Sequence, residues 1–300
     1  RLTRPKPSLT LATVTPMRLA FSTLTCPQWT FDEIAARARE FGYDGVELWG
    51  FFTGKPVVAA DALAAEPRAI LDSLGDLKIA ALVTAASMSG RESVPQATRE
   101  LRRFVDRAAD LRCGRVRLPA VSIPPRCNRA AVIDEFARWL AEVGDYAGDH
   151  GVQLAVENTG ALRRAADLWR LLELVNHPAV GACWDVLDAA MAGETPAVSV
   201  PTLNLRIAHV VVRDAACGPR GAEYRPLGEG QVQVRDLLRR LMGIGYDGWV
   251  SFEWEVALGQ NIGPCEQVLP QALAAMRQWT TPPRPAKPAK AAPATSTTGR

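Results

Sequence analysis

Residues 151–185, GVQLAVENTGALRRAADLWRLLELVNHPAVGACWD, contain a complete strand–helix–strand unit. The apolar runs VQLAVE (152–157) and VGACWD (180–185) are typical of buried strands, and Ala165–Val175 between them has the apolar spacing of a helix. A helix that joins two such strands is the usual crossover of a parallel sheet. The stretch therefore predicts a parallel α/β fold, and both of its strands end in an acidic residue.

The same alternation continues on both sides of this unit. Further strands are predicted at 18–24, 45–49, 78–84, 115–119, 207–213 and 248–253. Further helices are predicted at Phe31–Phe41, Pro95–Leu111, Ala130–His150, Val234–Ile244 and Cys265–Trp279. Eight strand–helix repeats in about 260 residues are the number that closes a (β/α)8 barrel, or TIM barrel. A doubly wound open sheet is the alternative, and the lack of a GxGxxG turn after the first strand disfavours it.

We expect one folded domain over residues 17–279. Residues 1–16 contain three prolines and no long apolar core, which predicts a disordered leader. Residues 280–300 are rich in Pro, Ala and Lys and predict a disordered tail, because such a segment buries too little apolar surface to order itself.

The composition of the 300-residue chain is that of a globular enzyme, with 48% hydrophobic and 22% charged residues. A net charge of +3 gives no electrostatic case for binding nucleic acid or a membrane surface. No apolar run approaches the roughly 20 residues of a membrane span. The six cysteines form no CxxC pair, which predicts reduced thiols and a cytoplasmic protein. The three histidines, His150, His177 and His209, are too few for histidine-rich metal chemistry.

Acidic residues stand at the ends of three strands, where a (β/α)8 barrel forms its active site. These residues are Glu157, Asp185 and Glu253, and strand alternation predicts that all three point into the barrel. Three converging carboxylates need a cation or a shared proton, and a hard divalent ion is the usual solution. The alternative is that each carboxylate forms a salt bridge with a barrel arginine, such as Arg117 or Arg213.

Six segments, in order along the chain, resemble the xylose isomerase-like barrel superfamily, and within it the sugar (phosphate) isomerase/epimerase branch. The segments are FGYDGVELW (41–49), GVQLAVENTG (151–160), VGACWDVLDAAMAGE (180–194), HVVVRD (209–214), PLGEGQV (226–232) and IGYDGWVSFEWE (244–255). Members of that family hold one divalent ion, often Mn2+ or Mg2+, with Glu, Asp, His and Glu ligands on strands five, six, seven and eight. The resemblance implies that Glu157, Asp185 and Glu253 are three of these ligands.

The chain departs from the family pattern at the fourth ligand. The strand-seven pattern H-x-H-x-K-D has its ligand three residues before the aspartate, and with Asp214 as that aspartate the ligand position is Val211. His209 corresponds to the preceding histidine, Asp188 stands where relatives often have a histidine, and Arg213 replaces the usual lysine. An all-carboxylate site, which Asp188 would join, favours Mn2+ or Mg2+ over zinc.

The resemblance implies a sugar or sugar-phosphate isomerase or epimerase of carbohydrate metabolism, in which Glu157 and Glu253 move a proton beside a carbonyl. With a metal, the ion polarises the substrate oxygens. Without one, shared protons and an arginine take over this role, as resemblance to hydroxypyruvate isomerase-like enzymes implies. A catalytically silent sugar-binding barrel is the non-enzyme alternative. Four further side chains are predicted to bind substrate: Glu47, Asp188, His209 and Arg213.

The expected partner is a small carbohydrate or a keto-acid, and neither nucleic acid nor a membrane. The DNA-repair branch of the superfamily uses several zinc ions and several histidines, which the three histidines of this chain cannot supply. The resemblance also allows a homodimer, because related barrels often dimerise.

Overall fold

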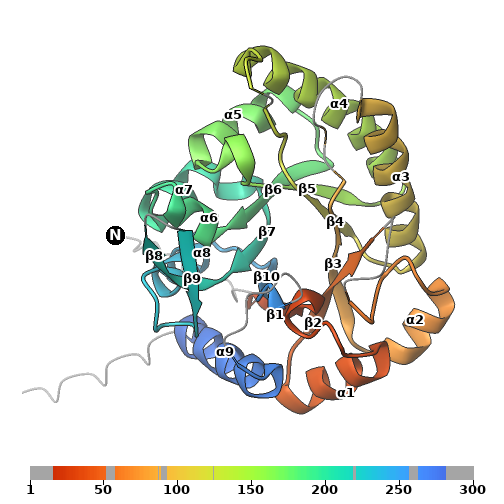
Figure 1. Cartoon of the computed structure of the whole chain (residues 1–300), viewed down its shortest axis with the longest axis vertical. Coiled ribbons are helices and arrows are strands. Elements are labelled where there is room, and N and C mark those ends of the chain that lie inside the picture. Colours follow the sequence, from red (N-terminus) through yellow and green to blue (C-terminus); the bar gives the residue numbers. More distant parts are fainter. Residues whose placement is uncertain are drawn as a thin grey trace, which may run out of the picture.

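Eight parallel strands close into a barrel, and helices surround it (Figure 1). The computed structural model describes residues 16–51, 58–86, 88, 93–123, 125–218, 221–256 and 263–281. The strand order around the barrel is β1-β10-β7-β6-β5-β4-β3-β2, which confirms the predicted (β/α)8 architecture. The barrel strands are β1 (Arg18–Ser22), β2 (Gly45–Gly50), β3 (Lys78–Thr84), β4 (Arg115–Leu118), β5 (Gln153–Glu157), β6 (Val180–Asp185), β7 (Ile207–Val212) and β10 (Trp249–Phe252).

Helices connect successive strands and cover the outside of the barrel. Six of them agree with the predicted helices to within one residue at each end: α1 (Phe31–Phe41), α3 (Val94–Asp110), α4 (Arg129–Asp149), α5 (Ala165–Val175), α8 (Val234–Gly243) and α9 (Cys265–Thr280). Three shorter helices add to these: α2 (Pro67–Leu74), α6 (Val186–Met191) and α7 (Pro196–Leu203). None of the helices in the described residues is both long and apolar enough to span a membrane.

The predicted leader and tail fall almost entirely outside the described residues. Of residues 1–16 the structure describes only residue 16, and of residues 280–300 only the first two.

Local sequence signals set both ends of α1 and so the start of β2. The Thr30 hydroxyl accepts a hydrogen bond from the Glu33 N–H at 3.3 Å, and the Glu33 carboxylate accepts one from the Thr30 N–H at 2.8 Å. This capping box satisfies two N–H groups that the first helical turn leaves free. The helix ends at Gly42, whose φ of 91° is the left-handed conformation that glycine adopts without strain. The chain can then turn directly into β2, which carries Glu47 into the barrel.

The inside of the barrel changes from apolar to charged along its axis. Small apolar side chains, among them Ala155, Cys183 and Val211, pack together in the middle. The carboxyl ends of the strands above them carry buried charged groups, including Asp185 and Glu253, both 0% exposed. Such charges need partners inside the protein, because water does not reach them.

An antiparallel hairpin, which the sequence analysis did not predict, lies between β7 and α8. It consists of β8 (Asp214–Gly218) and β9 (Gly221–Arg225), and Figure 1 shows it outside the barrel, near α6. The hairpin is anchored by Asp214, whose carboxylate accepts four backbone hydrogen bonds, from Ala215, Gly228, Gly230 and Val232. The segment Gly228–Gly230, a turn before α8, therefore wraps around one buried carboxylate.

Candidate active site

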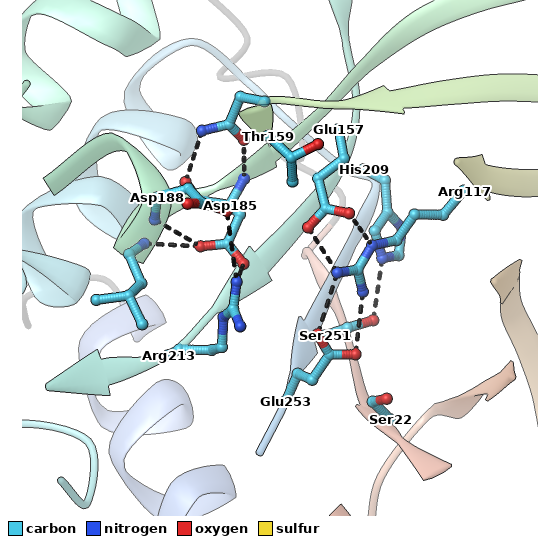
Figure 2. A network of polar contacts seen from close by, with 12 residues as sticks. Ser22, Arg117, Glu157, Thr159, Asp185, Asp188, His209, Arg213, Ser251 and Glu253 are labelled. Atoms are coloured by element: carbon cyan, nitrogen blue, oxygen red, sulfur yellow. Dashed lines mark hydrogen bonds and ion pairs between the residues drawn. The ribbon is translucent and has the colours of Figure 1, made fainter. Parts of the chain in front are cut away.

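The three predicted carboxylates lie together at the carboxyl ends of the barrel strands. Glu157 ends β5, Asp185 ends β6, and Glu253 follows β10 directly. Figure 2 shows Glu157 and Glu253 directed toward the same guanidinium group, that of Arg117 on β4, while Asp185 faces Arg213. Arginines therefore provide the positive charge between these carboxylates. This arrangement agrees with the alternative in which each carboxylate forms a salt bridge with a barrel arginine.

Arg117 is the centre of the site, and its side chain is 2% exposed. Its Nε and Nη2 donate to the two oxygens of Glu157 at 3.1 and 2.7 Å. Its Nη1 and Nη2 donate to the two oxygens of Glu253 at 3.1 and 3.0 Å, and Nη1 also reaches Glu47 at 3.4 Å. These five contacts match the five N–H donors of a guanidinium. Two carboxylates are thus held bidentately by one cation.

Arg213 holds Asp185 in the second half of the site. Oδ1 of Asp185 accepts the Leu187 and Asp188 N–H groups at 2.8 and 3.0 Å, so Asp185 is the N-cap of α6. Oδ2 of Asp185 lies 2.5 Å from Nη2 of Arg213. Asp188, in the first turn of α6, lies 3.7 Å from the same Arg213 nitrogen. The short helix α6 therefore brings Asp188 back toward Asp185.

Two residues outside the predicted set complete the surroundings of Arg213. Its Nη1 donates to the hydroxyl of Tyr224, on β9, and to the Glu255 carboxylate, both at 2.7 Å. The Tyr224 hydroxyl in turn donates to Glu255 at 2.6 Å. The unexpected hairpin thus contributes a side chain to the edge of the site. Nothing in the local pattern of GAEYR (221–225) indicates this contact.

Glu47 and His209 form a fully buried pair next to Arg117. Nε2 of His209 lies 3.2 Å from Oε1 of Glu47 and 3.1 Å from the Ser251 hydroxyl. Burial lowers the pKa of His209, so the imidazole is neutral at pH 7. Glu47 and His209 are each 0% exposed. Their position favours support of Arg117 over direct contact with substrate, whereas Asp188, with a side chain 17% exposed, can reach a substrate.

The two glutamates of the site differ in proton affinity. Burial raises the pKa of Glu157 to about 7, although the Arg117 guanidinium opposes this shift. Burial also acts to raise the pKa of Glu253, but Arg117 and Arg213 outweigh it and the pKa lies below its usual range. Near neutral pH both protonation states of Glu157 are therefore populated, while Glu253 is ionised. Pairs of carboxyl groups with separated pKa values are typical of acid–base catalysis.

The residues present do not fit the four-ligand metal site that the family resemblance implies. Val211 lies beside Asp185 on β6 and Ser251 on β10, so the position inferred for the strand-seven ligand is level with Asp185 and holds an apolar side chain. Both oxygens of Glu253 are engaged by Arg117. Among the described residues, one group of carboxylates has ligand atoms within 4.8 Å of one another, namely Glu157, Asp185 and Asp188.

Comparison with known proteins assigns the barrel to a family. The sequence profile of the family described as "Xylose isomerase-like TIM barrel" matches residues 35–279. The chain therefore belongs to the xylose isomerase-like TIM barrel family. It is 23% identical over 231 residues to a fructoselysine 3-epimerase of Shigella flexneri, which covers 72% of this chain and 82% of the relative. Over 128 residues, 41% of this chain and 43% of the relative, it is 30% identical to an uncharacterised protein of Methanocaldococcus jannaschii.

Solved structures of low sequence identity share the fold. A D-allulose 3-epimerase from Methylomonas sp., in complex with D-allulose, has a TM-score of 0.71 at 19% identity, covering 88% of this chain and 97% of that one. The IolI protein, solved with a bound zinc atom, has a TM-score of 0.73 at 16% identity and covers 88% of this chain and 98% of its own. The fructoselysine 3-epimerase relative supports an isomerase or epimerase, and the solved structures show the shared fold.

Proposed function

We propose that this chain is a sugar isomerase or epimerase in which Glu157 and Glu253 move a proton at a carbon next to a carbonyl. The observation that carries this proposal is the pairing of the two glutamates on one guanidinium at the mouth of a barrel of this family. The names of the relatives, which are 3-epimerases of fructoselysine and D-allulose, support a ketose-like substrate.

The reaction consists of two proton transfers. One carboxylate takes the proton from the carbon beside the carbonyl, the C–H electron pair forms a C=C bond, and the carbonyl pair moves onto oxygen to give an enediolate. The other carboxyl group, protonated, then returns a proton to carbon and the carbonyl re-forms. Delivery to the opposite face of the same carbon gives an epimer, and delivery to the neighbouring carbon, with a proton shift between oxygens, gives an isomer. Glu253 is ionised at neutral pH and can therefore accept the proton, and the raised pKa of Glu157 supports its role as acid.

The charge that develops on the substrate oxygen needs a nearby donor. Arg213 is suited to this role, because its Nε is buried and has no hydrogen-bond partner among the described residues. Mn2+ or Mg2+, the ions predicted from the sequence, would find oxygen ligands in Glu157, Asp185 and Asp188. We expect such binding to be weak, because Arg213 already neutralises Asp185. We also propose that the enzyme is cytoplasmic and that it acts on a carbohydrate or a keto-acid.

The test is proton exchange in heavy water. The purified protein is incubated with a panel of ketoses and keto-acids, and deuterium at the carbon beside the carbonyl is measured by NMR. Glu157→Gln and Glu253→Gln should each slow exchange by about 10²- to 10⁴-fold, the usual contribution of a general acid or base. Glu40→Gln, which removes an exposed ion pair with Arg37 on α1, is the matched control and should not change the rate.

Two outcomes contradict the proposal. Exchange that survives both active-site substitutions would remove these glutamates from the chemistry. Tight binding of a sugar by the wild type without any exchange would favour a catalytically silent sugar-binding barrel. The five hydrogen bonds of Arg117 to carboxylates are compatible with that function too.

A further inference from the structure

Two of the carboxylates that hold the metal ion in the family pattern already hold a cation here. Both oxygens of Glu157 and both oxygens of Glu253 accept hydrogen bonds from the Arg117 guanidinium, at distances from 2.7 to 3.1 Å. A divalent ion bound between these two groups would have to displace the guanidinium, or sit beside it at the cost of strong repulsion between like charges.

At the other two ligand positions of that pattern, the aspartate already has partners within the protein and the fourth side chain is apolar. Asp185 has one oxygen on the N-terminus of α6 and the other on Arg213. Val211 packs with Ala155 and Cys183 and offers no lone pair. All three ligand carboxylates are thus paired with an arginine, and the position that would supply nitrogen is apolar.

The contacts of Arg117 are also suited to proton transfer between the two glutamates. When a proton moves from one carboxyl group to the other, the negative charge stays next to the same guanidinium. The indole Nε1–H of Trp49 donates to Glu253 at 3.2 Å and to the Ser22 hydroxyl at 3.1 Å, which fixes Glu253 further. Because all five N–H groups of Arg117 are used within the protein, none is left to bind substrate.

We propose that Arg117 takes the place of the family's divalent ion between Glu157 and Glu253, so that the site works with a built-in cation and without a metal. Arg117 is then a positioning residue, since it acts through the two glutamates. This inference rests on the proposed isomerase or epimerase activity for its catalytic part. Its structural part, the occupation of the ion's place, stands independently.

The experiment compares wild type, Arg117→Met and Arg117→Lys. Arg115→Met is the matched control, because Arg115 lies two residues earlier on the same strand and its side chain makes, with the described residues, long hydrogen bonds of 3.4 and 3.5 Å to Ala80 and Gln153. Each protein is stripped with EDTA, checked for folding by circular dichroism, titrated with Mn2+ in a calorimeter, and assayed for deuterium exchange.

For the wild type we expect the exchange rate to stay within twofold after EDTA and after added Mn2+. Arg117→Met should lower kcat at least 100-fold with KM changed by only a few fold, and should bind Mn2+ at least tenfold more tightly, because four carboxylate oxygens are freed. Arg117→Lys keeps the charge without the bidentate geometry and should recover part of the rate. If Arg117→Met does not fold, the test uses Arg117→Lys instead. Its kcat should be lower than that of the wild type, and its exchange rate, like that of the wild type, should not change after EDTA.

The inference is overturned if EDTA abolishes wild-type exchange and Mn2+ restores it. It is also overturned if Arg117→Met folds and its Mn2+ affinity equals that of wild type and Arg115→Met. If no substrate shows exchange with the wild type, the proposed function fails, and the gain of Mn2+ binding in Arg117→Met still decides whether the arginine occupies the ion's place.

Discussion

Replacing Asp214 by asparagine is expected to lower the free energy of unfolding by about 3 to 6 kcal/mol. The carboxylate is 1% exposed, and each of its oxygens accepts two backbone hydrogen bonds, at 2.8 to 3.1 Å. Asparagine keeps one acceptor oxygen, so two of the four bonds are lost, and its NH2 group faces N–H donors. Hydrogen bonds to a charged group contribute about 1.5 to 3 kcal/mol each, which gives the range stated.

Urea unfolding followed by tryptophan fluorescence measures this loss, as a fall in the transition midpoint at constant slope. Asp236→Asn is the matched control, because it removes an exposed i,i+4 pair with Arg240 and should cost no more than about 0.5 kcal/mol. A loss below about 1 kcal/mol in Asp214→Asn would refute the reasoning, since it would mean that the four hydrogen bonds do not hold the segment before α8.

Three further outcomes are expected. Val211→His should tighten Mn2+ binding in calorimetric titration, and more so in an Arg117→Met background. Equal affinities for wild type and both variants would mean that position 211 does not face the carboxylates. At pH 8 one thiol, Cys127, should react rapidly with iodoacetamide, because it is the exposed one of the six free cysteines; a rapid phase that persists in Cys127→Ser would contradict this. Burial raises the pKa of Cys265 to about 11, so its thiol stays protonated at pH 8 and its alkylation should speed up about tenfold per pH unit between 8 and 10. A rate that levels off below pH 9 would show a lower pKa.

The barrel and its three acidic strand ends could be predicted from the sequence because both follow from short-range patterns. A strand of a parallel barrel is buried on both faces, so its sequence is a continuous apolar run. Such runs predict β3 and β6 with the bounds that the structure shows. Strand alternation then assigns Glu157, Asp185 and Glu253 to the inner face. The family resemblance extended this prediction to their role, which is a proposal.

The partners of those carboxylates could not be predicted in the same way. The sequence RVRL of β4 does place Arg115 and Arg117 on one face, and two inward arginines are a signal that a charged site is near. The choice of carboxylates that Arg117 contacts depends on the distances across the barrel to β2, β5 and β10. A local sequence pattern does not determine those distances. The hairpin is formed by the pairing of β8 with β9, and its part in the site, the contact of Tyr224 with Arg213, could not be predicted for the same reason.

Asn158, the residue after β5, connects the end of β5 to the end of β6 through its side chain. Its side-chain amide donates to the C=O of Asp185 at 2.9 Å and accepts from the N–H of the same residue at 2.5 Å, so a side chain extends the β5–β6 pairing after the backbone ladder ends. These two hydrogen bonds join the end of β5, next to Glu157, to Asp185 at the end of β6. A change in the length or sequence of the segment after Asn158 would therefore leave in place the two hydrogen bonds that set the spacing of these carboxylates.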